Sequence, residues 1–221
     1  MLSKPNSKLS KYFSKYGYKV MSFGLNAIET CPFRGECAKG CYATQGSYKW
    51  SPVKKKRDNN LRYSKLNDFI TRMNYHLEQA RPKRGNKELV IRIHDSGDFY
   101  RQSYADKWVE IAEQNKDVHF YAYTKSVRYF KDNYDRLPDN LKIIFSFGGK
   151  DDHLIDINKH AHCHIFPDTF DLLLNGYEDA SNNDMVAAFS ETKRIGIVYH
   201  GYNSKEWSTD QSFNSKKVVS K

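Results

Sequence analysis

Six short apolar runs with the composition of buried β-strands are spaced along this chain, and helical patterns separate most of them. In ELVIRIHDSGDF, for example, the apolar core at 89–93 is followed by the polar turn that begins near Asp95. Strands separated by helices form βαβ units, and their right-handed crossovers produce a parallel sheet. The predicted strands lie at residues 18–23, 89–93, 118–123, 141–147, 162–166 and 195–199.

Helices are predicted between these strands. Apolar residues recur at helical spacing over 52–81, the longest predicted element, and further helices are expected at 102–114, 126–136 and 150–159. The periodicity is compatible with an open sheet and with an incomplete (β/α) barrel. Both place functional residues just beyond the C-terminal ends of the strands. We therefore expect one rim to carry the polar clusters at 94–98, 124–126, 148–152 and 200–201.

A single α/β domain is expected for residues 18–201, because a chain of 221 residues can bury one substantial core. A basic segment, 1–17, precedes this domain and a polar tail, 202–221, follows it; both are predicted to be solvated. No apolar run approaches the ~20 residues of a membrane span, and the N-terminus lacks the apolar centre of a signal peptide. The sequence thus predicts a cytoplasmic protein with no membrane partner.

Three of the four cysteines lie in the stretch TCPFRGECAKGCYA, at Cys31, Cys37 and Cys41. In a reducing compartment, clustered cysteines hold a metal or do redox work more often than they form disulfides. Zinc sites usually contain closely paired cysteines, whereas a cubane cluster accepts the wider gaps of C-x5-C-x3-C. The spacing favours a 4Fe-4S cluster, with zinc as the alternative metal and unligated core thiols as the ordinary explanation.

The fourth ligand of such a cluster is sought outside the loop. Cys163 lies in the sequence HAHCH, where a thiol among three imidazoles is unusual for an ordinary core strand. We therefore predict Cys163 as the fourth metal ligand. A neighbouring histidine, or an exogenous molecule on an open iron, is the competing interpretation.

Polar residues beyond two other strands are candidates for catalysis. His94, Asp95 and Asp98 follow the second predicted strand, and Lys125 follows the third. At the mouth of a sheet these groups could bind a substrate or orient a cluster ligand. The alternative is structural, because Asp95, Ser96 and Asp98 are also suited to capping the helix that follows them.

The net charge of +10 makes DNA or RNA a plausible partner. Part of the excess lies near the two ends of the chain, and the rest gathers along the predicted helix that begins at Pro52. A solvated helix face is the alternative interpretation. The nucleic-acid candidates are Lys54, Lys55, Lys56, Arg57 and Arg62.

Four motifs, in chain order, resemble a known family. They are CPFRGECAKGCYA, IRIHDSGDFYRQSYADKWVEIAEQN, HFYAYTKS and IGIVYHG, and together they are similar to the phage "gene product eighty-eight" family of iron-sulfur proteins. The likeness extends over about residues 20–201. It implies an iron-sulfur cluster, a phage or mobile-element setting and therefore the host cytoplasm.

The layout also resembles a reduced radical S-adenosylmethionine enzyme, which implies a partial barrel. In such enzymes a three-cysteine loop follows the first strand, the place of Cys31, Cys37 and Cys41 here. A Gly-Gly-Glu-like cofactor-binding segment follows the second strand, where this chain has Ser96, Gly97 and Asp98. The usual spacing is C-x3-C-x2-C, from which this chain departs. S-adenosylmethionine could bind only if the fourth iron is open, so ligation by Cys163 would argue against radical chemistry.

Two classes of function follow from these observations. In one, the protein is an enzyme whose cluster does redox or radical chemistry at the strand rim, on or beside nucleic acid. In the other, it is a non-catalytic DNA- or RNA-binding protein in which the cluster, or zinc, is a structural staple.

Overall fold

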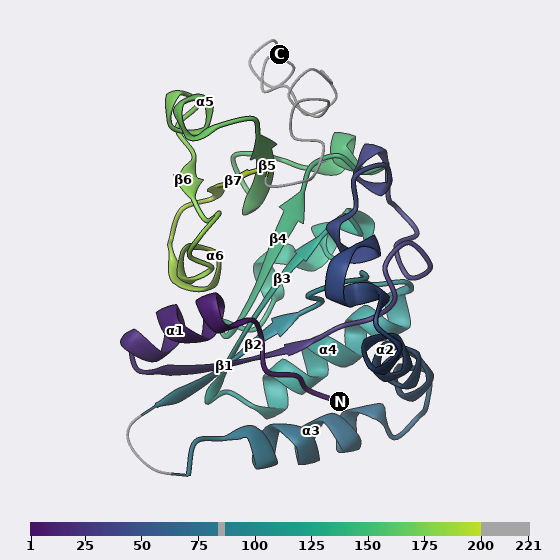
Figure 1. The fold of residues 1–221 in the computed structure, drawn as a ribbon. Helices are drawn as coiled ribbons and strands as arrows, with labels where there is room; N and C mark the ends of the chain where they lie inside the picture. The colour runs from purple at the N-terminus through teal and green to yellow at the C-terminus, as the bar shows by residue number, and fades with distance from the viewer. Residues whose placement is uncertain (84–86, 200–221) are drawn as a thin grey trace.

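All seven strands run parallel in a single sheet that curls into half of a barrel, with helices at its flanks (Figure 1). The computed structural model describes residues 1–83 and 87–199. Neighbouring strands follow the order β1-β2-β3-β4-β5-β7-β6, so only the last two exchange places. The strands are β1 (Tyr18–Phe23), β2 (Glu88–Ile93), β3 (Val118–Thr124), β4 (Leu141–Ser146), β5 (His162–Phe166), β6 (Glu178–Asp179) and β7 (Arg194–Val198). The predicted α/β fold with a curled parallel sheet is confirmed.

The described helices are short, and the connections after several strands consist of 3-10 turns. The α-helices are α1 (Ser7–Lys15), α2 (Ser51–Ser64), α3 (Phe69–Ala80), α4 (Gln102–Gln114), α5 (Thr169–Leu174) and α6 (Met185–Phe189). The 3-10 helices are η1 (Glu36–Ala38), η2 (Tyr42–Thr44), η3 (Gly46–Lys49), η4 (Val127–Tyr129), η5 (Lys131–Arg136) and η6 (Asp152–Leu154). Within the described ranges, no helix is long and apolar enough to cross a bilayer.

Side chains alternate between the two faces of each strand and build a large core on each face, with a small third cluster of Phe166, Leu172 and Tyr177 near β5. On the outer face, Ile91 and Phe120 pack with Trp108 of α4 and Met73 of α3. On the inner face, residues from six strands converge in one cluster that includes Tyr121, and α1 and α6 complete it. Convergence of so many strands on one cluster is what the curl of the sheet produces.

The sequence-based strands agree closely with the structure, whereas several predicted helices do not. The predicted helix 52–81 is wrong: it is two helices, α2 and α3, separated at 65–68. Leu66 continues the apolar spacing but is 40% exposed, because the chain turns there. The segments at 126–136 and 150–159 form 3-10 turns instead of α-helices.

The first residues of the chain are packed, which corrects the prediction of a solvated basic segment at 1–17. Phe13 of α1 is fully buried and its ring stacks on Tyr121, with the centroids 6.4 Å apart. Ser3 also forms an isolated antiparallel β-bridge with Ser22 of β1. At the other end, the predicted rim pair His200 and Gly201 and the predicted tail 202–221 lie outside the described residues.

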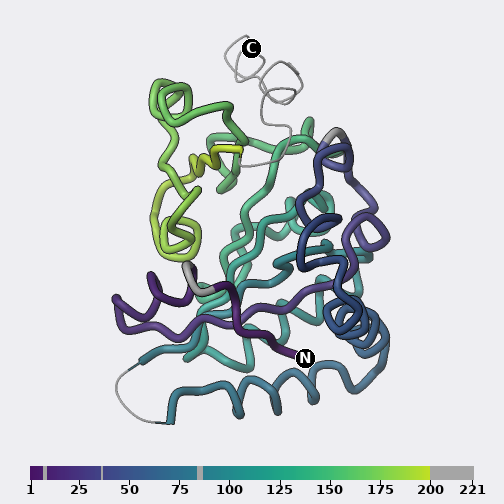
Figure 2. Tube along the Cα trace, viewed as in Figure 1, coloured from purple at the N-terminus to yellow at the C-terminus, as the bar shows by residue number. Residues whose placement is uncertain are grey.

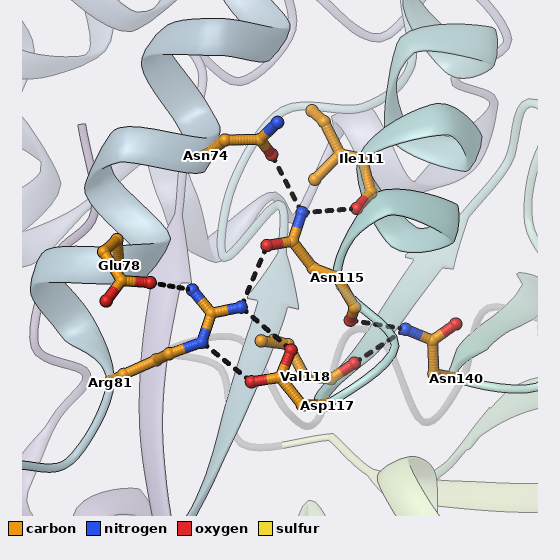
Figure 3. A network of polar contacts seen from close by, with 8 residues as sticks. All are labelled: Asn74, Glu78, Arg81, Ile111, Asn115, Asp117, Val118 and Asn140. Atoms are coloured by element: carbon orange, nitrogen blue, oxygen red, sulfur yellow. Dashed lines mark hydrogen bonds and ion pairs between the residues drawn. The ribbon is translucent and has the colours of Figure 1, made fainter.

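A network of amides and charged groups connects the end of α3 with the N-terminal ends of β3 and β4 (Figure 3). The Arg81 guanidinium donates to both carboxylate oxygens of Asp117, at 2.7 and 2.8 Å, and also to Glu78 and Asn115. The Asn140 amide lies within hydrogen-bond distance of three backbone carbonyls, those of Ala112, Asn115 and Val118, at 2.9–3.0 Å. These contacts join the end of α3, the turn between α4 and β3, and the start of β4.

Replacing Asn140 with alanine should lower the free energy of unfolding by about 1 kcal/mol, because it removes the side-chain amide that donates to these partly buried carbonyls. Chemical denaturation monitored by circular dichroism measures this change. Asn67→Ala is the matched control: Asn67 is exposed, and its replacement should change the stability by less than about 0.5 kcal/mol. Equal effects of the two substitutions would contradict the role assigned to Asn140.

Candidate functional site

A cavity of about 430 Å³ lies at the C-terminal ends of the strands, and all four cysteines of the chain line it. Its wall combines the cysteine loop after β1 with residues at the ends of β2, β3, β4, β5 and β7. Because the strands are parallel, these ends meet at one edge of the sheet. The cavity is thus built by the chain segments that the sequence placed on one rim.

The cysteine loop is braced against the segment that follows β4. Arg34 pairs with Gly149 in an isolated β-bridge, and the Lys150 amide donates to the Phe33 carbonyl at 2.9 Å. The traces of the two segments lie side by side at the upper edge of the sheet (Figure 2). Gly35 permits this approach, because a Cβ there would lie only 2.6 Å from the Gly148 carbonyl oxygen.

The interior of the loop is held by Arg34. Its guanidinium donates at 3.0 Å to the carbonyls of Ile28 and Cys31. Arg128 stacks over the Phe33 ring at 4.2 Å and forms an ion pair with the buried carboxylate of Asp151. The loop is therefore an ordered part of the cavity wall.

The three loop thiols are free and half-buried. Burial raises the pKa of Cys31 to about 12, and the charges of Asp98 and the other two loop cysteines add to this shift. Burial also raises the pKa of Cys41, while the Lys125 ammonium acts in the opposite direction. The thiols are thus close enough to influence one another. Among the described residues, no three His, Cys, Asp or Glu side chains are grouped so as to hold a metal ion.

Cys163 lies on the inner face of β5, in register with Ser146 of β4 and Ile195 of β7. It is buried, and burial raises its pKa to about 12, with Lys125 acting in the opposite direction. Lys125 therefore acts on the thiols of both Cys41 and Cys163. Cys163 belongs to the wall of the cavity, on a different element from the cysteine loop.

The histidines beside Cys163 point away from the cavity, because neighbouring residues of a strand face opposite sides of the sheet. His162 lies 3.2 Å from the Tyr177 hydroxyl, and the His164 ring stacks on Phe147 with centroids 3.9 Å apart. Burial lowers the pKa of His164 to about 3, and both of its ring nitrogens lack a hydrogen-bond partner. Neither histidine is among the residues that line the cavity.

The turn after β2 places its polar residues in three different environments. His94, at a positive φ of 62°, directs its ring into the core, where Nε2 lies 2.8 Å from the Tyr104 hydroxyl. Burial lowers the pKa of His94 to about 3, so its imidazole is neutral. The Asp95 carboxylate lies 3.6 Å from the Arg57 guanidinium. Both side chains make contacts within the protein that hold the turn.

Ser96, Gly97 and Asp98 all line the cavity. The Ser96 hydroxyl donates to the Leu25 carbonyl at 2.6 Å and accepts from Arg57 at 2.5 Å. Gly97 has a φ of 79°, and a Cβ there would lie 2.5 Å from Thr30 Oγ1, so the turn requires glycine. This segment is packed directly against the start of the cysteine loop.

The Asp98 carboxylate is buried and accepts hydrogen bonds from the Thr124 hydroxyl and from the backbone amides of Phe99 and Lys125. Burial raises its pKa to about 6, and these three donors act against that shift. Asp98 thereby joins the turn after β2 to the end of β3. The predicted capping of the following helix is wrong, because the N-cap residue of α4 is Arg101 and no side chain caps it.

Lys125 brings a positive charge to the cavity. Its ammonium donates to Ser146 Oγ at 2.7 Å and to the carbonyls of Phe147 and Ser146 at 2.9 and 3.2 Å. These acceptors are all neutral, and the ammonium makes no ion pair with the described residues. The charge of Lys125 is therefore positioned by the end of β4 and directed at the cavity wall.

The structure divides the basic residues of α2 into two groups. Arg57 is buried, stacks on the Tyr48 ring at 4.4 Å and holds Ser96, so it supports the turn after β2. Lys56 donates to the Leu2 carbonyl at 2.8 Å. Lys54, Lys55 and Arg62 remain exposed. Only part of the predicted nucleic-acid set is thus directed to solvent.

Three further cavity residues were missed by the sequence analysis. Arg92 and Tyr123 lie on the inner face, and Ser146 supports Lys125. Arg92 forms an ion pair with Asp184 at 2.9 Å, and its Nε is buried without a partner, as is the Tyr123 hydroxyl. The available signal was their alternation with Ile91, Ile93 and other apolar residues in the predicted strands.

A sequence profile described as Gene product 88 matches residues 1–217 of the chain. No curated protein and no solved structure matches the chain.

The low pKa of His164 predicts a pH dependence of stability. An unfolded histidine, with its ordinary pKa of about 6.5, binds a proton more readily than buried His164 as the pH falls from about 6.5 to 3. The free energy of unfolding therefore falls over this range. At pH 5, His164→Phe should make the protein more stable than the wild type by about 2 kcal/mol, with a smaller difference at pH 7.5.

Urea denaturation at the two pH values measures this effect. His153→Phe is the matched control, because it makes the same substitution at an exposed residue. If both variants shift the curve alike, the buried neutral state of His164 is refuted.

Proposed function

The chain belongs to the Gene product 88 family, and on this premise we propose that it is an iron-sulfur protein with a 4Fe-4S cluster at the rim of its half-barrel. Cys31, Cys37 and Cys41 would bind the cluster, and the cavity beside them would receive a substrate. The observation that carries this proposal is that all three loop cysteines line one cavity at the C-terminal ends of the strands. The family resemblance supports a phage setting, and hence the host cytoplasm.

The arrangement of the thiols favours a cluster over a single metal ion. A zinc ion holds its sulfur ligands at about 2.3 Å, so those sulfurs must converge on one point. A 4Fe-4S cluster takes each cysteine on a different iron, and its ligands are spread around a larger body. Half-buried thiols on one ordered loop, at unequal sequence spacing, fit the second case better.

The electrostatic surroundings also suit thiolate ligands. Burial raises the pKa values of Cys31 and Cys41, so without a metal these thiols hold their protons. Binding iron requires the thiolate form and releases those protons. The Lys125 ammonium, which has only neutral hydrogen-bond acceptors around it, would then offset part of the negative charge.

Cys163 stands apart from the loop thiols. It lies on the inner face of β5, in register with Ser146 and Ile195, whereas the other three thiols share the single loop after β1. We therefore assign three ligands to the loop and leave the iron that faces the cavity to an exogenous ligand. When bound, such a cluster supplies one-electron chemistry to that ligand, and S-adenosylmethionine becomes a candidate.

In this enzyme the residues of the chain position the reactants. Lys125 holds a positive charge near the cluster, and Arg92 and Tyr123 present polar atoms on the inner face of the sheet. The remaining wall is largely apolar, with Ile165 and Ile197 among its residues, and excludes water from the reacting groups.

The second candidate is a non-catalytic nucleic-acid-binding protein with a closed cluster or zinc as a staple. The exposed lysines of α2 favour nucleic-acid association, and this association is compatible with either candidate. Ligation of the cluster by Cys163 would favour the staple.

Anaerobic purification followed by iron, sulfide and zinc analysis tests the proposal. We expect iron and sulfide in near-equal amounts, lost on Cys31→Ser, Cys37→Ser or Cys41→Ser because each change removes a ligand. The matched control is Cys163→Ser, which should keep the iron. Addition of S-adenosylmethionine to the reduced wild type should alter its electron paramagnetic resonance spectrum.

Each other outcome has a defined meaning. Zinc in place of iron, or no metal in the folded protein, would refute the cluster. Loss of iron from Cys163→Ser would refute the open iron and favour the closed staple.

A further inference from the structure

The segment that leads from the cavity wall into the first half of α2 is strongly basic. Residues 38–57 contain five lysines and one arginine but no aspartate or glutamate. Two large aromatic side chains in the same segment are exposed: Tyr42, at 56%, and Trp50, at 65%. Exposed aromatic rings beside several exposed lysines are typical of surfaces that bind nucleic acid.

This segment is anchored to the rest of the fold. Tyr42 lines the cavity, and its hydroxyl donates to the Asp95 carbonyl at 2.6 Å. Its ring meets Tyr48 edge-on at 5.7 Å, and Tyr48 in turn lies under the Arg57 guanidinium. The 3-10 helices η2 and η3 therefore form a fixed path from the cavity to the start of α2.

Nothing in the fold accounts for the Trp50 side chain. Its backbone carbonyl begins α2 by accepting from the Lys54 amide at 3.0 Å, and its indole plays no part in this cap. Within residues 1–83 and 87–199, no aromatic ring packs against it. The indole is thus available to a ligand.

Lysines close to Trp50 in the sequence are also available to a ligand. Arg57 is buried and the Lys56 ammonium donates to the Leu2 carbonyl, but Lys49, Lys54 and Lys55 are exposed and make no ion pair with the described residues. Positive side chains close in sequence to an exposed indole suit a partner with both phosphates and flat rings. In a duplex the faces of the bases are already stacked, so the partner must have unpaired bases.

We infer that this surface binds single-stranded nucleic acid, with one base stacked on Trp50 and phosphates at Lys49, Lys54 and Lys55. The strand then leads toward Tyr42 at the lip of the cavity. This inference rests on the nucleic-acid association in the proposed function and is independent of the metal.

Fluorescence anisotropy with labelled oligothymidylate and oligouridylate, and with a duplex of the same length, tests the inference. Both single strands should bind more tightly than the duplex. Trp50→Ala should weaken single-strand binding about tenfold through lost stacking, and Trp50→Phe should retain most of the affinity. Tyr75→Ala is the matched control, because Tyr75 is an exposed aromatic residue on α3, distant in sequence from this surface.

The lysines are tested through the salt dependence of binding. The double variant Lys54→Ala/Lys55→Ala should reduce the slope of log affinity against log salt by about 1.4, at about 0.7 for each phosphate contact. Lys83→Ala/Lys116→Ala removes the same charge from exposed residues that precede β2 and β3, at the opposite end of the sheet from the cavity. That control should leave the slope nearly unchanged.

Several results would overturn the inference: equal affinity for the duplex, equal effects of Trp50→Ala and Tyr75→Ala, or no affinity for any oligonucleotide. Iron content is measured on every sample. Equal binding of duplex and single strands refutes this inference and leaves the nucleic-acid association intact, whereas no binding of any oligonucleotide refutes both. Strand binding without iron refutes the proposed cluster alone.

Discussion

The parallel direction of the seven strands is the constraint from which the rest of the structure follows. It brings the C-terminal ends of the strands to one edge, so each loop that leaves a strand there becomes part of the same wall. The curl of the sheet then directs the inner side chains toward one cavity. Its wall includes residues as distant in sequence as Cys31 and Cys163. A cluster or substrate placed there would contact segments from most of the chain.

The cavity wall depends on a few buried polar contacts between loops. Asp98 joins the turn after β2 to the end of β3, and Arg57 joins the same turn to α2. The bridge between Arg34 and Gly149 joins the cysteine loop to the end of β4. These contacts satisfy groups that burial would otherwise leave unpaired, and they leave Lys125 with neutral acceptors beside the thiols. The charge available to a ligand is therefore a consequence of how the loops are held.

Sequence patterns predicted the strands well because each is a short apolar run that ends in polar or glycine residues. The patterns failed where the helical apolar spacing continued past the residue at which a helix ends. The spacing continues through Leu66, but the turn at 65–68 ends α2 and exposes that side chain. Helix α1 was missed because its lysines dominate the composition, although Phe13 and Leu9 anchor it in the inner core.

The sequence by itself predicted six of the seven strands in their order, the family and the presence of three thiols on one short loop. The tertiary structure decided what individual side chains do. Packing of α2 turned Arg57 inward and left Lys55 outside, although the two are close neighbours in the same basic run. The pleat of β5 directed Cys163 to the cavity and its adjacent histidines to the opposite core. The direction in which a side chain points depends on backbone geometry and on contacts with residues distant in sequence. Residue composition carries neither kind of information.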